Sequence, residues 1–187
     1  MSTPLVVANW KMHGDQARCA SLARQVVRAL RRPPVDAEVV LAPPFTALNT
    51  VHRCLGGSPI KLAAQNCHWE SQGAYTGEIS PAMLNELGCA YIIVGHSERR
   101  QLFHESDAII ARKLKSVLSQ GMRAILCVGE TLDERQSKNT VLVIRRQLRI
   151  ALKGLEKTDI ANIEIAYEPV WAIGTGQNAT PKQISQV

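Results

Sequence analysis

Residues 5–11 read Leu-Val-Val-Ala-Asn-Trp-Lys, a run of four apolar residues followed by Asn9, Trp10 and Lys11. A short apolar run of this kind is typical of a buried β-strand. A Rossmann fold would follow its first strand with the glycine-rich pattern G-x-G-x-x-G, which is absent here. The stretch therefore predicts a strand with polar groups at its carboxyl end, and it disfavours a dinucleotide-binding fold.

Further apolar runs recur along the chain, separated by segments with helical spacing. After Leu5–Ala8, the expected strands are Glu38–Ala42, Ile60–Ala64, Tyr91–Val94, Arg123–Val128 and Asn162–Tyr167. Because these runs are apolar on both sides and alternate with helical segments, they predict an α/β fold with a parallel sheet covered by helices.

Two helical segments have an apolar face and a candidate start. One face contains Ala20, Ala23, Val27 and Leu30, and the other contains Val141, Ile144, Leu148 and Ala151. Asp15 and Thr140 stand just before these faces, so we expect them to be the N-caps of the two helices.

Polar side chains gather just after the expected strands, which bears on whether the sheet is open or closed. They are Asn9, Lys11, Gln65, Asn66, His96, Glu130 and Glu168. An open doubly wound sheet brings together only the strand ends beside its switch point, whereas a barrel brings all of them to one mouth. The distribution therefore favours a (β/α)8 barrel.

The repeat length indicates that the barrel is incomplete in this chain. The five units between Asn9 and Glu168 span roughly 32 residues each, so eight units would need about 250 residues. We therefore expect a single barrel domain over residues 1–187, with about six βα units and an incomplete C-terminus. Two open sheet edges would then invite association with other chains.

The composition argues against a nucleic-acid-binding protein. The net charge of +6 suggests a nucleic-acid partner, but the arginine pairs are dispersed and aromatic residues make up only 4% of the chain. A nucleic-acid-binding surface interleaves basic residues with stacking aromatics, so we expect no nucleic acid and interpret the charge as solvated helix faces. Such a field can still attract a phosphorylated metabolite.

The apolar runs and cysteines indicate a cytoplasmic protein. No run is long enough for a membrane span and the chain shows no secretion signal, so we expect no membrane. The five cysteines are odd in number and widely spaced, which indicates reduced, mostly buried thiols. Paired Cys or His ligands at short spacing are lacking, so we expect no metal site.

The stretch Ala166–Gly176, Ala-Tyr-Glu-Pro-Val-Trp-Ala-Ile-Gly-Thr-Gly, places a carboxylate directly before a proline. Pro169 stiffens the backbone beside Glu168. An apolar stretch follows (Val170, Trp171, Ala172 and Ile173), and then Gly174, Thr175 and Gly176. A rigid start and a glycine-rich end fit a hinged lid, and an ordinary loop with a buried tryptophan fits equally well.

In four motifs the chain resembles the triosephosphate isomerase family. They are Asn9–Met12 (Asn-Trp-Lys-Met), Val94–Arg100 (Val-Gly-His-Ser-Glu-Arg-Arg), Cys127–Thr131 (Cys-Val-Gly-Glu-Thr) and the Ala166–Gly176 stretch. The loop Gly73–Glu78 is also similar, with Tyr75 where the family commonly has phenylalanine. The resemblance runs from Asn9 to the last residue.

The resemblance implies a TIM barrel that interconverts an aldose and a ketose triose phosphate without a cofactor. Glu168 would be the base that moves a proton between adjacent carbons, and His96 would polarise the carbonyl and handle the oxygen-bound protons. A neutral imidazole at this position is a well-known property of the family. Lys11 would supply positive charge to the enediolate and the phosphate, and Asn9 would orient the substrate oxygen.

The resemblance also implies supporting roles. Glu98 would hold Lys11, Ser97 would lie near Glu168, and Glu130 would touch the lid near Trp171. Gly174 would offer a backbone N–H to the phosphate when the lid closes. The long aperiodic loop at residues 65–80 would insert into a second subunit around Tyr75 and Thr76, which predicts a homodimer for the complete protein.

Two alternatives stay open at this point. Barrel enzymes of this kind commonly bind phosphate with the loops after strands seven and eight, which lie beyond Val187. The chain could therefore be an inactive fragment that acts only in folding or association. Another phosphosugar isomerase or an aldolase would need a different base, a Schiff-base lysine in a strand or a metal cluster, and the motifs offer none.

Overall fold

The computed structural model describes residues 3–30, 36–173, 176 and 178–187, and it contains one sheet of six parallel strands in chain order. The strands are β1 (Leu5–Asn9), β2 (Glu38–Ala42), β3 (Lys61–Ala64), β4 (Cys89–Val94), β5 (Arg123–Val128) and β6 (Ile163–Tyr167). All six expected strands are thus confirmed, with bounds that differ by no more than two residues.

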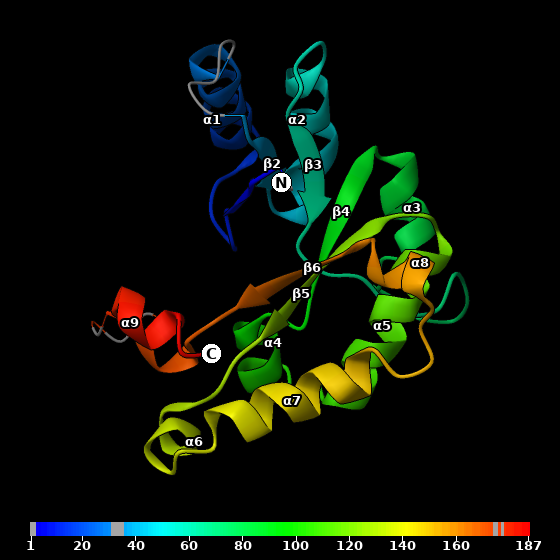
Figure 1. Ribbon diagram of the computed structural model, residues 1–187. Helices are drawn as coiled ribbons and strands as arrows, with labels where there is room; N and C mark the ends of the chain where they lie inside the picture. Colours follow the sequence, from blue (N-terminus) through cyan, green and yellow to red (C-terminus); the bar gives the residue numbers. More distant parts are fainter. Residues whose placement is uncertain (1–2, 31–35, 174–175, 177) are drawn as a thin grey trace.

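Helices connect successive strands, as a parallel sheet requires, and one further helix follows the last strand. They are α1 (Gln16–Ala29), α2 (Leu48–Leu55), α3 (Pro81–Glu86), α4 (Ser97–Leu102), α5 (Asp107–Ser119), α6 (Leu132–Gln136), α7 (Thr140–Ala151), α8 (Lys157–Ile160) and α9 (Pro181–Ile184), with one-turn 3₁₀ helices at Phe45–Ala47 and Val170–Ala172. Figure 1 shows α1 beside α2 over one part of the sheet and α5 beside α7 over another.

The starts of α1 and α7 differ. Asp15 is the N-cap of α1, and its side chain accepts a hydrogen bond from the Arg18 backbone N–H, as expected. The N-cap of α7 is Asn139, without a side-chain hydrogen bond, so the prediction of Thr140 was wrong by one residue. The expected α7 face is also partly wrong, because Val141 is 48% exposed.

Strand side chains alternate between two apolar layers. One layer lies between the sheet and the helices and includes Leu41, Ile92 and Leu126. The other lies on the opposite face of the sheet, the interior of the curled sheet, and includes Val40 and Ile93. Apolar residues on both faces are what a parallel strand buried on both sides requires.

The sheet is a partial barrel. In the part of the chain that the structure describes, β1 pairs only with β2 and β6 pairs only with β5. Val6 on β1 is 54% exposed and Ile165 on β6 is 50% exposed, so both edge strands present apolar side chains to solvent. The α/β fold class with six βα units is therefore confirmed, as are the two open edges.

A polar cluster ties the amino-terminal ends of the strands together. The Tyr91 hydroxyl donates to Glu38 at 2.9 Å, and Arg123 contacts Glu38, Tyr91 and Glu164. These residues come from β2, β4, β5 and β6. The cluster lies at the strand starts, opposite the end where the polar residues of the motifs gather.

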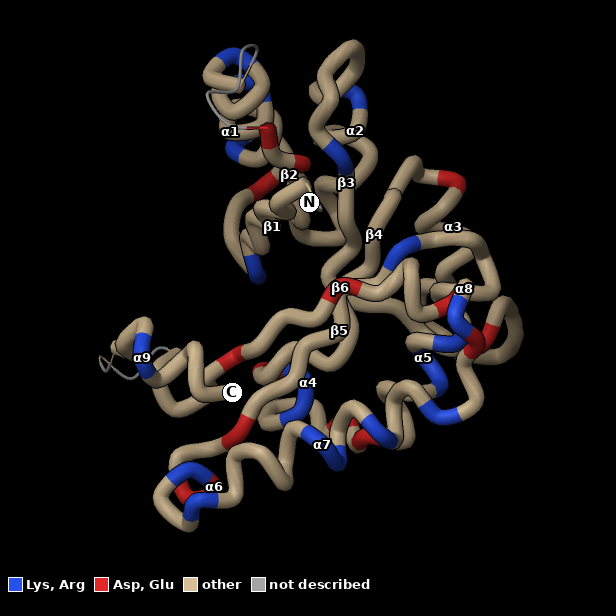
Figure 2. The backbone as a smooth tube through the Cα atoms, in the orientation of Figure 1, with Lys and Arg blue, Asp and Glu red and all other residues tan. Residues whose placement is uncertain are grey.

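Charge and thiols are distributed as expected. Figure 2 shows basic positions spread over several helices. Cys19, Cys67, Cys89 and Cys127 are buried, and Cys54 is partly buried. Across the described ranges, no helix is long and apolar enough to cross a membrane.

Candidate active site

The strand register brings the motif residues to the carboxyl edge of the sheet. Asn9 is the last residue of β1, His96 follows β4 by two residues, and Glu168 follows β6 directly. The Glu168 backbone N–H also donates to the Val128 carbonyl at 2.8 Å, which continues the pairing of β5 with β6 past the strand end. Residues far apart in sequence therefore meet at one mouth.

Glu168 and His96 are in direct contact. His96 Nε2 lies 3.1 Å from Glu168 Oε1, and both side chains are largely buried. The other carboxylate oxygen, Oε2, accepts a hydrogen bond from the Ser97 backbone N–H at 2.8 Å. Both oxygens of Glu168 thus have a partner on the segment that begins α4, which fixes the orientation of the carboxylate.

The position of His96 at the start of α4 indicates which ring nitrogen carries the proton. His96 is the N-cap residue, and its Nδ1 accepts from the Glu98 backbone N–H at 3.2 Å. An accepting Nδ1 has no hydrogen in a neutral imidazole, so the hydrogen is on Nε2, which faces Glu168. The Glu98 carboxylate also lies 3.5 Å from Nδ1, but its shorter contact, at 2.8 Å, is with Lys11.

Lys11 adopts a left-handed backbone conformation, with φ of 52°. Residues other than glycine rarely adopt this conformation, so hydrogen bonds to neighbouring residues must stabilise it. Its backbone N–H donates to Asn9 Oδ1 at 2.9 Å, and its carbonyl accepts from Gln65 Nε2 at 2.8 Å. Gln65 and Asn9 therefore support a backbone that points the Lys11 ammonium to Glu98.

One cavity of about 200 Å3 brings these groups together. It is lined by Asn9, Lys11, Met12, Phe45, Gln65, Asn66, His96, Glu98, Arg99 and Phe103. Glu168 does not line it directly, but its carboxylate contacts His96, which does. The cavity thus combines two cationic side chains, one carboxylate, an imidazole and three side-chain amides, which suits a small anionic or polar ligand.

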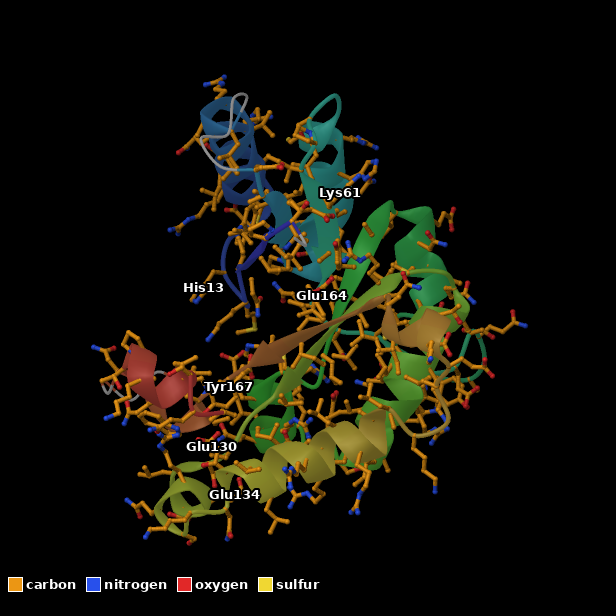
Figure 3. The ribbon with its side chains drawn as sticks, viewed as in Figure 1. His13, Lys61, Glu130, Glu134, Glu164 and Tyr167 are labelled. Atoms are coloured by element: carbon orange, nitrogen blue, oxygen red, sulfur yellow. The ribbon has the colours of Figure 1, made fainter. Side chains whose placement is uncertain are left out.

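The stretch after Glu168 is anchored by a buried carboxylate. Glu130 is fully buried and accepts 3.0 Å hydrogen bonds from the Tyr167 hydroxyl, Trp171 Nε1 and Arg135. Burial and the hydrogen bond to Glu130 raise the pKa of Tyr167 to about 12, so its hydroxyl keeps its proton. Figure 3 shows Glu130 and Tyr167 next to each other.

Trp171 is buried within the short 3₁₀ helix Val170–Ala172, and Arg135 stacks on its ring at 4.6 Å. The burial of the tryptophan fits both a lid and an ordinary loop. Gly174 and Thr175 lie outside the described residues. Gly176 has φ of 75°, a conformation that favours glycine.

The segment at residues 65–80 has no helix or strand, as expected. The start of this segment is held by a buried charge cluster, in which Lys113 Nζ contacts Glu105 at 2.5 Å and Asn66 at 2.8 Å. Further along, the His68 ring stacks on Tyr75 with centroids 4.6 Å apart, while Tyr75 itself and Thr76 are exposed. The structure therefore presents the tip of the loop to solvent.

Sequence reasoning missed two residues beside the site. Cys127 lies next to Glu168, and burial, followed by the charge of Glu168, raises the pKa of its thiol. Arg100 donates to the carbonyls of Gly95 and Cys127, which joins the ends of β4 and β5. Both residues belong to the quoted motifs, but only their spatial contacts reveal what they do.

In the described part of the chain, no group of three or more His, Cys, Asp and Glu residues is arranged to hold an ion. The site contains carboxylate, imidazole, ammonium and amide groups. Such a set is sufficient for proton transfer.

Comparison with known proteins places the chain in a family. A family model described as triosephosphate isomerase matches residues 4–187. Proteins named triosephosphate isomerase are similar to all of this chain: 52% identity in Syntrophotalea carbinolica, over 73% of that relative's length, 49% in Pelobacter propionicus, over 74%, and 50% in Chlorobium phaeovibrioides, over 74%. The resemblance of the motifs is thereby confirmed, and the chain belongs to the triosephosphate isomerase family.

Proposed function

We propose that this chain carries the proton-transfer site of a triosephosphate isomerase, which interconverts D-glyceraldehyde 3-phosphate and dihydroxyacetone phosphate. The observation that supports it most is the pairing of the Glu168 carboxylate with His96 Nε2 at 3.1 Å, at the same mouth as Lys11. A base, a hydrogen-bond donor and a cation at one mouth suit the removal of a proton next to a carbonyl group.

Glu168 acts as the base. Its carboxylate takes the proton from the carbon next to the carbonyl, and the electron pair of that C–H bond forms the carbon–carbon double bond of an enediolate. His96 takes the hydroxyl proton from one oxygen of the enediolate and gives a proton to the other oxygen, and return of the carbon-bound proton to the neighbouring carbon then gives the other triose phosphate. No oxidant or reductant is consumed, because the two carbons exchange oxidation states within one molecule.

His96, Lys11 and Asn9 act on the oxygens. The Nε2–H group of His96 donates to the carbonyl oxygen of the substrate, where negative charge develops. The Lys11 ammonium, which Glu98 contacts at 2.8 Å, stabilises this charge and the phosphate. Asn9 orients the same oxygen, and Ser97 supports the base through its backbone N–H.

Residues 169–176 act as a lid over the substrate. Pro169 stiffens its start, Val170, Trp171, Ala172 and Ile173 form its apolar part, and Gly174, Thr175 and Gly176 form its end. In the closed state, Gly174 donates its N–H to the phosphate and the lid excludes water from the enediolate. The 3.0 Å hydrogen bond from Trp171 Nε1 to Glu130 is the resting contact of the lid in this proposal.

The complete protein is a cytoplasmic homodimer in this proposal. The exposed tip of the segment 65–80, with Tyr75 and Thr76, inserts into a second subunit near its active site. Four buried thiols support a reducing compartment. Sedimentation of the complete protein as an active monomer would overturn the dimer.

The test is the conversion of glyceraldehyde 3-phosphate to dihydroxyacetone phosphate by the purified chain, followed by NMR. We expect Glu168→Gln to lower kcat by about 10²–10⁴-fold, because the amide cannot accept the proton. This variant also controls for contaminating host enzyme. Equal background rates in both proteins would show that the chain alone is inactive and would favour the folding or association role.

A further inference from the structure

Gln147 is a polar residue on the buried face of α7. It lies one turn from Val143 and one turn from Ala151, both of which are buried, and it is itself only 5% exposed. A buried amide is costly unless its donor and acceptor are both bonded. A hydrophobic side chain would suit this face equally well, so the amide calls for a physical reason.

The reason lies in the backbone of Gly129. Gln147 Oε1 accepts from the Gly129 N–H at 2.9 Å, and Gln147 Nε2 donates to the Gly129 carbonyl at 2.9 Å. One side-chain amide therefore holds both polar groups of one residue, as a neighbouring strand would do. This fixes the orientation of the peptide units on either side of Gly129, just after the end of β5.

Gly129 lies against the backbone of the base. A Cβ atom at this position would come within 1.9 Å of the Glu168 carbonyl oxygen and 3.2 Å of a Val170 methyl group. The Glu168 N–H is bonded to the neighbouring Val128 carbonyl at 2.8 Å. The main chain of Glu168 and the start of the lid therefore pack against Gly129, which Gln147 holds in place.

We infer that Gln147 is a positioning residue for Glu168, acting through Gly129. The inference rests on the proposed role of Glu168 as the base. Displacing Gly129 would shift the Glu168 backbone and separate its carboxylate from His96 and from the Ser97 N–H. Misplacement of a catalytic group by ~1 Å can cost about 100-fold in rate.

The surroundings of Gln147 allow a sharp test. A cavity of about 380 Å3 is lined by Ser97, Gly129, Gln147 and Val170, and therefore lies beside both the base and the lid. The charged groups that also line it are Arg100, Glu105, Asp107, Glu134 and Arg146. Gln101, an exposed residue of α4, lines the same cavity and provides a matched control.

The informative variant is Gln147→Glu. When protonated, the introduced carboxylic acid can donate to the Gly129 carbonyl and accept from the Gly129 N–H, as the amide does. When ionised, it has no donor and repels that carbonyl. Burial raises the pKa of a carboxyl group, so the neutral form is favoured at mildly acidic pH. Gln101→Glu makes the same change of charge without touching Gly129.

We expect Gln147→Glu to lower kcat about tenfold relative to Gln101→Glu at pH 8, with KM changed less than about twofold. As the pH falls to 6, the kcat of Gln147→Glu approaches that of Gln101→Glu, because the protonated side chain restores both hydrogen bonds to Gly129. In parallel, hydrogen exchange at the Gly129 and Glu168 amides is faster at pH 8, while the Trp10 amide, bonded to Ala42 across the sheet, is unaffected.

Exchange at Glu168 that equals that of Gln101→Glu at every pH would overturn the inference, as would a kcat loss without pH recovery. If the unaltered chain has no isomerase activity, the proposed function fails for this chain, but the exchange measurement still decides the role of Gln147. If Gln147→Glu fails to fold, Gln147→Asn, one methylene shorter, is measured in the same way. Faster hydrogen exchange at the Gly129 and Glu168 amides, with the Trp10 amide unaffected, then supports the inference. The absence of this difference overturns it.

Discussion

At the scale of single residues, folding changes the acidity of two buried thiols. Burial raises the pKa of Cys67 and of Cys89 from 9.0 to about 12. The charged thiolate is disfavoured because burial keeps water away from both sulfurs. Both thiols therefore stay protonated in the folded chain at pH values where the unfolded chain has already lost those protons.

This shift predicts a loss of stability in alkali. Above pH 9 the unfolded chain releases the two protons and the folded chain keeps them until about pH 12, so rising pH favours unfolding. Between pH 9 and 10 the two thiols together should lower the free energy of unfolding by about 2 kcal/mol. Urea unfolding at each pH measures this.

The matched comparison uses a Cys67→Ala/Cys89→Ala double variant, whose free energy of unfolding should fall less steeply with pH. Val141→Ala, which replaces an exposed side chain that carries no titratable group, should keep the slope of the unaltered chain. Identical slopes in all three proteins would contradict the shift.

At the scale of elements, the helices α1 and α7 begin differently. The Asp15 carboxylate accepts the Arg18 N–H at 2.8 Å and so satisfies one of the free donors of the first turn of α1. Asn139 stands at the same position of α7 without such a bond. The side chain at the helix start therefore stabilises α1 and not α7.

Replacing each cap with alanine measures this difference. Asp15→Ala should lower the free energy of unfolding by about 1 kcal/mol, the usual cost of losing an N-cap side chain. Asn139→Ala should cost only about 0.3 kcal/mol, because no hydrogen bond is lost. Chemical denaturation of the two variants gives both values, and equal losses would show that the Asp15 bond does not contribute.

At the scale of the whole molecule, the partial barrel leaves two strand edges and their apolar side chains uncovered. Val6 and Ile165 lie on the two edge strands and are half exposed. Unpaired backbone groups beside exposed apolar side chains favour pairing with another chain. The 187-residue chain should therefore associate through these edges.

Sedimentation over a range of concentrations tests this association. We expect species larger than the monomer, whose proportion rises with concentration and falls in a Val6→Lys/Ile165→Lys variant. Val141→Lys, at an equally exposed valine on α7, should leave the association unchanged. Association that is insensitive to the edge variant would point to another surface, such as the tip of the loop with Tyr75 and Thr76.

Local periodicity was sufficient to predict the strands, because a parallel strand buried on both faces is apolar along its whole length. It was weaker for α7, where Val141 fits the apolar spacing but is exposed, and Gln147 breaks the spacing but is buried. Helix burial depends on which elements pack around the helix, and a single segment does not contain that information.

The sequence by itself determined the alternation of strands and helices, the position of each polar motif at a strand end, and membership of the family. It did not reveal that Gln147, 21 residues before Glu168 in the chain, bonds both backbone groups of Gly129, the residue that lies against the Glu168 backbone. The tertiary structure alone decided this, because both hydrogen bonds and the close approach of Gly129 to Glu168 exist only once α7 packs against the end of β5. Sequence motifs indicate the candidate chemical groups of the site, whereas tertiary packing determines which other residues hold those groups in place.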